Sequence, residues 1–230
     1  MIKSISAISI LAIATLVGTQ AFAHPDHDDD KDSKNRVEQS FDYKDFDHIE
    51  VVGVYNMDVK VGGSGYSIET SGRAKDMERM KVYLDGDTLV LSTEKKKKSR
   101  GWRGKKNHKG IDITITMPAL YGLEIAGIGS GEVTGIDSDK FDVEIAGIGS
   151  MELSGRCGTL DADYAGMGDL DARDLKCENV NVDMSGMGSA TVYASDSVDA
   201  DMSGMGSIDV YGKPKNVSKS KSFMSSVDIH

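Results

Sequence analysis

Residues 125–133 read IAGIGSGEV, and four later segments repeat the pattern: IAGIGSMEL from residue 145, YAGMGDLDA from 164, MSGMGSATV from 184 and MSGMGSIDV from 202. A degenerate copy, FMSSVDI, begins at Phe223. The leading glycines of the complete copies are spaced by 20, 19, 20 and 18 residues: Gly127, Gly147, Gly166, Gly186 and Gly204. A repeat this short is one structural unit, which buries a core only by stacking on its neighbours.

Each repeat holds two short runs in which apolar and polar residues alternate, one on either side of the glycine pair. Alternation with a period of two indicates β-strands, because successive side chains of a strand point to opposite faces. Glycines suit the bend between the runs, since they accept positive φ and close backbone contact at the least steric cost. The sequence therefore predicts an all-β chain whose repeats stack into a solenoid.

Alignment of the repeats assigns side chains to the interior or to the surface. Four apolar columns are predicted to fill the interior: Tyr121, Phe141, Leu160, Val180 and Val198; Leu123, Val143, Ala162, Val182 and Ala200; Ile125, Ile145, Tyr164, Met184 and Met202; and Val133, Leu153, Ala172, Val192, Val210 and Ile229. The intervening carboxylates then face outward: Glu124, Glu144, Asp163, Asp183 and Asp201, with a second row of Asp142, Asp161 and Asp199. Such ladders can recruit a cation, but a flat row supplies fewer oxygens than a calcium cage, which favours a solvated, repulsive face.

One more apolar column lies between the two glycines of each pair: Ile128, Ile148, Met167, Met187 and Met205. Its side chains either fill a corner of the solenoid or form an exposed apolar stripe. Large exposed apolar patches are uncommon on monomeric proteins. We therefore expect this column to fill the corner.

The two cysteines, Cys157 and Cys177, occupy equivalent positions of consecutive repeats. Stacked strands lie about 4.8 Å apart, within the Cα separation that a disulfide accepts. In an oxidising compartment the pair can form a disulfide. The alternative is two stacked, half-buried thiols, and the residues alone leave both open.

The first 23 residues have the features of a secretory signal peptide: Lys3, an apolar stretch over 8–17, and Ala21-Phe22-Ala23 before a polar segment. The mature chain is expected to begin at His24. The apolar stretch is shorter than the roughly 20 residues that a spanning helix needs, and no later segment approaches that length. We expect an exported protein without a transmembrane segment, in the periplasm, outside the cell or on the surface of a Gram-negative bacterium.

The mature chain is predicted to have three parts. Residues 24–40 have almost no apolar content and are expected to form a disordered tail, which offers weak ligands for Zn or Cu: His24, Asp26, His27 and Asp28 to Asp30. Residues 41–118 form an N-terminal β section, with a hairpin-like turn at 62–65, one or two helical turns within 75–81, a turn at 85–87, and a last strand that Pro118 ends. Residues 119–230 hold the repeats.

Several segments together resemble the GIN-domain family, which is described as putative autotransporter adhesin heads: FDHIEVVGVYNMDVKV from Phe46, DGDTLVLST from Asp85, IDITITMPALYGLEIAG from Ile111, and the glycine repeats. The resemblance covers residues 46–230. It implies a single-stranded, pectin-lyase-like parallel β-helix, with an N-terminal β section as its cap. It implies adhesion, and it brings no catalytic residues.

The segment 94–110 is strongly basic, with nine Lys or Arg against Glu94 for a net charge of +8, and it is longer and more basic than the family pattern. The rest of the mature chain carries −19. Its cations and Trp102 are candidate ligand-binding residues for an anionic polymer or glycan: Lys95, Lys96, Lys97, Lys98, Arg100, Trp102, Arg103, Lys105, Lys106 and Lys109. The other interpretation is a solvated hairpin tip that protects an edge strand.

The sequence favours a non-enzymatic binding protein without a cofactor or a fixed metal site. Serines recur at the bends, but no histidine lies between Lys109 and His230 to activate one. The glycine pairs lack the rest of a dinucleotide fingerprint, and we expect no specific nucleic-acid partner. The alternatives are a carbohydrate-active enzyme that uses the outward carboxylates, and a structural module that self-assembles when the basic segment of one copy docks on the acidic face of another.

Overall fold

The computed structural model describes residues 36–93 and 110–230, which belong to one structural unit. These residues form an all-β fold, as predicted, and its sheet is mixed because it contains both parallel and antiparallel pairs. The elements are β1 (Arg36–Phe41), β2 (His48–Val61), β3 (Ser67–Arg73), α1 (Ala74–Met77), β4 (Met80–Asp85), β5 (Thr88–Thr93), β6 (Ile111–Met117), β7 (Gly122–Met202), β8 (Met205–Tyr211), β9 (Asn216–Lys221) and β10 (Ser225–Ile229). No helix of the described part is long and apolar enough to cross a membrane.

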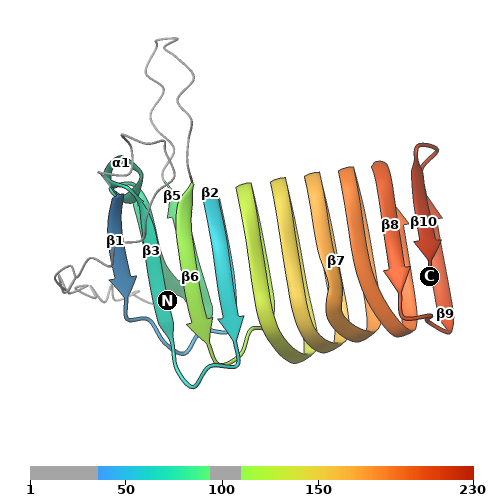
Figure 1. The fold of residues 1–230 in the computed structure, drawn as a ribbon, viewed down its shortest axis with the longest axis horizontal. Coiled ribbons are helices and arrows are strands. Elements are labelled where there is room, and N and C mark those ends of the chain that lie inside the picture. Colours follow the sequence, from blue (N-terminus) through green and yellow to red (C-terminus); the bar gives the residue numbers. More distant parts are fainter. Residues whose placement is uncertain (1–35, 94–109) are drawn as a thin grey trace, which may run out of the picture. The chain divides into compact units, whose positions relative to one another are not determined.

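The long element β7 winds as a series of turns that lie side by side, followed by β8 to β10 (Figure 1). Its last turns pair in parallel with the strands that follow, Met187 with Met205 and Val198 with Val217. Backbone of one turn meets backbone of the next at the glycines, as at Gly166, which lies against Gly147. Segments about 20 residues apart are therefore neighbours, which is the spacing of the sequence repeat.

The stack begins before the first sequence repeat, because β2 pairs in parallel with the start of β7 from His48 opposite Gly122 to Lys60 opposite Thr134. Its glycine, Gly53, stands opposite Gly127. The other edge of β2 pairs with β5 and then with β6. β2 is thus a repeat unit in its own right, although its sequence lacks the second glycine of the pair.

The predicted hairpin across residues 62–65 is wrong. β6 lies between β2 and β3, parallel to the first and antiparallel to the second. Every second residue of β6 is buried, and these apolar side chains gain more contact between two strands than at an edge. The predicted turn at 85–87 is confirmed, since β4 and β5 pair across it with Gly86 at φ 65°. α1 is a single helical turn that begins one residue before the predicted stretch and overlaps its start.

Residues 36–40, which the sequence analysis assigns to the tail, form most of β1. This strand pairs with β3 from Arg36 opposite Arg73 to Phe41 opposite Ile68. Its side chains are nearly all exposed, so its apolar content is low even though its backbone is paired. The strand is held by that pairing and by the Arg36 guanidinium, which bonds Ser71 and forms an ion pair with Asp112.

The four predicted interior columns are buried, with two exceptions. Tyr121 is 41% exposed, because Leu120 takes the interior position where the chain enters β7. Ile229 is only half-buried, since β10 is the last strand of the stack. Each buried Val, Leu or Ile of the columns contributes about 1.5–3 kcal/mol to folding.

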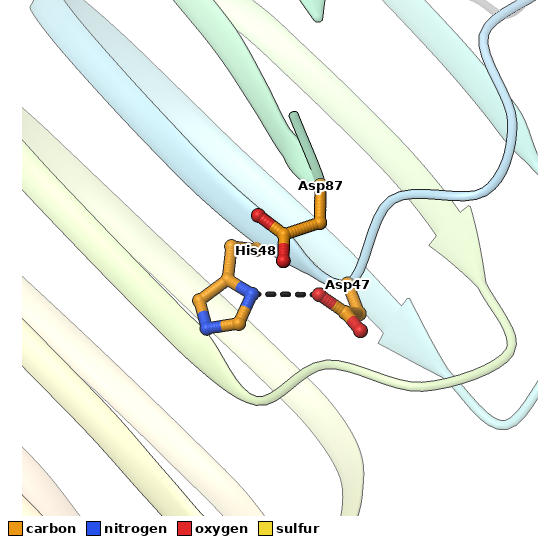
Figure 2. A group of neighbouring side chains, drawn as sticks. All are labelled: Asp47, His48 and Asp87. Carbon is orange, nitrogen blue, oxygen red and sulfur yellow. Dashed lines mark hydrogen bonds and ion pairs between the residues drawn. The ribbon is translucent and has the colours of Figure 1, made fainter. Parts of the chain in front are cut away.

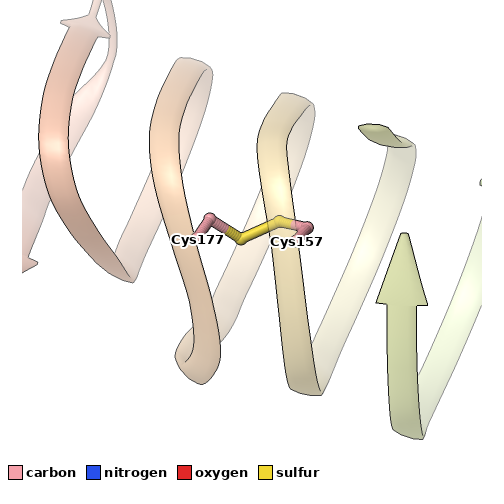
Figure 3. The surroundings of a disulfide bond; sticks show 2 residues. All are labelled: Cys157 and Cys177. Carbon is pink, nitrogen blue, oxygen red and sulfur yellow. A yellow bond between two sulfur atoms is a disulfide. The ribbon is translucent and has the colours of Figure 1, made fainter. Parts of the chain in front are cut away.

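Cys157 and Cys177 are joined by a disulfide between adjacent turns of β7, with their Cα atoms 4.5 Å apart (Figure 3). Both side chains are buried. The bond closes a loop of one repeat, from one turn of the stack to the next. It restricts the unfolded chain more than the folded one, because the two positions are already neighbours in the fold.

We expect the Cys157→Ala/Cys177→Ala variant to lose about 3 kcal/mol of unfolding free energy, the value for a loop of this length. Urea unfolding of the two proteins measures the difference. Dithiothreitol should destabilise the wild type by a similar amount and leave the variant unchanged. Equal stability of the wild type with and without reductant would show that the bond is absent.

Candidate interaction surface

The column Ile128, Ile148, Met167, Met187 and Met205, here called the apolar column, is exposed, with 42–51% of each residue accessible to solvent. The prediction that it fills a corner of the solenoid is wrong. The column runs across successive turns, one side chain per repeat. It is an unusual feature, because exposed apolar side chains are normally scattered over a protein surface rather than aligned.

The glycines on either side explain why the column faces outward. A Cβ built on Gly166 would lie 1.8 Å from the carbonyl oxygen of Gly147, so the backbones of adjacent turns touch where a side chain would otherwise stand. No space for a side chain is left between adjacent turns at this point of the stack. The residue between the glycines points the opposite way and is directed into solvent.

The apolar column continues at both ends. Val54 of β2 stands opposite Ile128 and is half-buried. At the other end Met224, 61% exposed, directly precedes Ser225, which pairs with Gly206. Every turn from β2 to β10 therefore contributes an apolar side chain at this position.

Two rows of carboxylates flank the apolar column along the strands. The first acidic column lies four residues before it and consists of Glu50, Glu124, Glu144, Asp163, Asp183 and Asp201. The second acidic column lies four residues after it and consists of Asp58, Glu132, Glu152, Asp171 and Asp209, with Thr191 in the remaining repeat. At about 3.3 Å per residue, each row is about 13 Å from the apolar column. The prediction that the first row faces outward is confirmed, since its repeat members are exposed or half-buried.

In the repeats the side chains between the three rows are small, apart from Asp169, so the apolar side chains project above their surroundings. Two residues before the apolar column the positions are Ala126, Ala146, Ala165, Ser185 and Ser203; two residues after it they are Ser130, Ser150, Asp169, Ser189 and Ser207. We call the apolar column with its two acidic columns the interaction face. It combines a narrow apolar ridge with negative charge on both sides.

At the β2 end of the interaction face, the surface is hollowed by a pocket of about 330 Å³. Its carboxylates come from three neighbouring strands: Asp58 of β2, Asp112 of β6, and Glu132 and Glu152 of β7. Asn56 donates a hydrogen bond to Asp112 across it, at 2.8 Å. The hollow adds a concave, acidic end to the face.

A family model described as putative auto-transporter adhesin, head GIN domain, matches residues 45–214. The chain belongs to this family. The match includes β2, β6, β7 and β8, and so includes the strands that carry the apolar column from Val54 to Met205.

Several solved structures resemble this GIN domain, including the two that follow. A putative adhesin from Bacteroides fragilis is 26% identical, with a TM-score of 0.67, over 86% of this chain and 99% of the other. A putative lipid binding protein from Parabacteroides distasonis is 17% identical, with a TM-score of 0.50, over 86% of this chain and 98% of the other, and shares the fold. No curated protein matches the chain.

The GIN domain carries a second, wider hollow of about 840 Å³, on the side of the disulfide. Its cations already have partners: Lys140 binds Asp142 and Asp161 at 2.6 and 2.8 Å, Arg156 binds Asp137 through two nitrogens, and Lys176 lies over the ring of Tyr193. The hydrogen bonds from Lys140 and Asn181 hold the pKa of Asp161 below its usual value. Lys176 also lies 3.4 Å from the Asp174 carboxylate, so each of the three cations is paired with a carboxylate and this hollow does not form a basic patch.

The basic segment proposed as a ligand site lies outside the described residues, from Lys95 to Lys109, as do the signal peptide and the histidines of the tail. The interaction face is the feature that sequence reasoning missed. A signal for it was present, because a glycine on each side of an apolar residue leaves room for close backbone packing on the inner side of the strand.

The charges of the first acidic column repel one another. Partial burial raises the pKa of Glu124, and the neighbouring Glu50 and Glu144 raise it further. The pKa of Asp183 is raised in the same way, by burial and then by Asp201 and Asp163. Repulsion between neighbouring carboxylates therefore destabilises this column, and a cationic partner would reduce the repulsion.

We expect Glu124→Gln to stabilise the folded chain at pH 7. The raised pKa means that ionisation of Glu124 costs more in the folded chain than in the unfolded one, so this carboxylate lowers stability as pH rises through its pKa. The gain is about 0.5 kcal/mol or less because the group is exposed and screened. Thermal unfolding at pH 7 and at pH 3 measures it. The difference should vanish at pH 3, where the carboxyl is protonated in both states; a difference that persists there would contradict the electrostatic cause.

Proposed function

We propose that the protein is an exported, non-enzymatic parallel β-helix of the adhesin type, which binds its partner through the interaction face. The parallel pairing of β8 and β9 with β7 at offsets near one repeat, and of β2 with the start of β7, supports the β-helix. The observation that carries the function is the exposed apolar column, aligned over successive turns. An aligned row of exposed Ile and Met side chains lowers solubility, and such rows usually mark a binding surface.

The chemistry of the interaction face fits a cationic amphipathic polypeptide segment. From Val54 to Met205 the column spans six repeats, about 24 Å at one strand spacing per repeat. An α-helix of about 16 residues has this length, with a diameter of about 10–12 Å. A helix lying on the ridge places its apolar side chains on Ile and Met, and its Lys or Arg side chains extend toward the acidic columns on both sides.

Charge disfavours the other occupants of this face. A second copy that placed its own interaction face here would oppose carboxylates to carboxylates. An anionic polymer or an anionic lipid surface would meet the same repulsion. The basic segment 94–110 of a second copy has the right charge, and its docking there is one outcome that the experiment distinguishes.

The test is a titration of the purified mature chain with a fluorescent 18-residue peptide of Leu and Lys that forms an amphipathic helix. We expect saturable binding that weakens as salt rises, because carboxylate contacts are screened. Two controls are a scrambled peptide of the same composition and a Leu and Glu peptide. Binding of the scrambled or the acidic peptide as tight as that of the first would overturn the proposal. Binding by a chain lacking residues 94–110 but not by the full chain would show that the basic segment occupies the face.

We further propose, from the sequence, that the basic segment 94–110 binds an anionic polymer or glycan at the cell envelope. Nine cations and Trp102 in one short segment support this. Heparin binding should fall steeply with ionic strength and be lost when Lys95 to Lys98 become Ser. Heparin binding that survives this change would refute the role of the segment.

The alternative of a carbohydrate-active enzyme has its best support in the acidic hollow beside β2, where four carboxylates converge. An enzyme of this kind would release reducing ends or unsaturated products from a panel of glycans.

The alternative of a structural module predicts self-association that rises with concentration and is disrupted by salt. Sedimentation measurements with and without residues 94–110 separate it from the binding protein.

A further inference from the structure

Three side chains converge where β2 begins: Asp47 and His48 from the start of the strand, and Asp87 from the turn between β4 and β5 (Figure 2). Each offers one ligand atom, and the three atoms lie within 4.8 Å of one another. The imidazole Nδ1 of His48 is 2.6 Å from an Asp47 carboxylate oxygen. No single sequence motif contains all three residues, because Asp87 follows the other two by about 40 residues.

The backbone fixes the positions of these residues. The amides of Asp47 and His48 both donate to the carbonyl of Asp87, at 3.0 and 3.2 Å. Tyr121, just before β7, donates its amide to the carbonyl of Asp47 at 2.8 Å. Three segments that are distant in sequence are therefore tied together under the cluster, and the ligands are held on a folded scaffold rather than on a free loop.

The imidazole of His48 lies in space that is open because residue 122 is a glycine. His48 stands opposite Gly122 in the parallel register. A Cβ on residue 122 would lie 2.3 Å from the Cδ2 atom of His48 and 2.9 Å from its Nε2. Only glycine therefore allows the ring to lie in this position. Gly122 thus leaves room for the ring beside the carboxylates.

We propose that Asp47, His48 and Asp87 form a binding site for a divalent transition-metal ion of the zinc class. One imidazole nitrogen and two carboxylate oxygens are a ligand set that zinc accepts, with water completing the coordination. Imidazole selects zinc-like ions over magnesium and calcium, which prefer all-oxygen sites. The side chains of Asp47 and His48 are 38% and 39% exposed, which leaves an open side for the ion and its water. The ion replaces the contact between the His48 imidazole and the Asp47 carboxylate, and it joins the start of β2 to the β4–β5 turn.

The experiment is an isothermal titration of the mature chain with ZnCl₂, in a background in which His24 and His27 are replaced by Ala. This background removes the two histidine ligands of the tail, which leaves only weak carboxylates there, so that tight binding reports on the folded domain. We expect one saturable site, lost or weakened by more than about tenfold in His48→Gln and in Asp87→Asn. Zinc should also raise the melting temperature of the background protein and not that of His48→Gln, because it binds only the folded site.

His230→Ala is the matched control. His230 also pairs with a carboxylate, Asp209 at 2.9 Å, but no second carboxylate joins that pair among the described residues. Zinc binding should be unchanged in this variant. Absence of a saturable site in the background protein, retention of full affinity in both His48→Gln and Asp87→Asn, or calcium binding as tight as zinc would each overturn the proposal. Melting curves without zinc confirm that each variant is folded.

Discussion

Replacing Gly166 by Ala is expected to destabilise the fold by about 3 kcal/mol or more, although it adds a single methyl group. The added Cβ would lie 1.8 Å from the carbonyl oxygen of Gly147 and 2.8 Å from its carbonyl carbon. Both atoms are backbone, so no side-chain rotation relieves the contact. Adjacent turns would have to separate at this point, with loss of the hydrogen bonds between them.

The control for this variant is Gly65→Ala, in the connection between β2 and β3. A Cβ on Gly65 meets no atom within 4 Å. Its effect should stay within about 0.5 kcal/mol, as for an ordinary surface substitution. Urea unfolding followed by circular dichroism measures both. Equal stabilities of the two variants would show that the turns do not stack glycine on glycine.

The second large effect concerns binding. We expect the double variant Ile148→Asp/Met167→Asp to bind the Leu and Lys peptide at least about 100-fold more weakly than the wild type, because two central apolar contacts are lost at roughly 1.4 kcal/mol or more each. Both residues are nearly half exposed, at 46% and 43%, so stability should change little. Fluorescence anisotropy and thermal unfolding measure the two quantities.

The sign of this effect distinguishes the apolar column from the charges around it. The variant adds two carboxylates to a face that attracts cations, so a purely electrostatic site would bind the peptide more tightly. Ser195→Asp, at an exposed position eight residues beyond Met187 along the chain, adds charge outside the rows of the interaction face and should leave affinity unchanged. Tighter binding by the double variant would show that the ridge makes no contribution.

Periodicity was sufficient to predict much of this fold. The alternation within each repeat predicted the buried columns and the outward carboxylates, because strand geometry fixes which residues share a face. It did not predict that β6 inserts between β2 and β3, since strand order depends on contacts between distant segments. The low apolar content of residues 36–40 concealed β1, which is held mainly by backbone pairing.

The candidate site was mispredicted for an identifiable reason. The glycine pairs were interpreted as bends that leave a corner to be filled, whereas at Gly147 and Gly166 the glycines allow close contact between the backbones of adjacent turns. The apolar residue between the glycines is therefore directed outward. The cluster of Asp47, His48 and Asp87 was beyond prediction, because only the folded chain brings the β4–β5 turn to the start of β2.

Methionine oxidation tests the central claim, that the apolar column faces solvent and binds the partner. Dilute hydrogen peroxide followed by peptide mass spectrometry compares methionines in the same repeats. Met167, Met187 and Met205 should form sulfoxides quickly, while Met184 and Met202, which are 2% and 0% exposed, should resist. Bound Leu and Lys peptide should protect the first three. Oxidation of Met184 and Met202 at the rate of the others, or no protection of Met167 and Met187 by saturating peptide, would contradict the account.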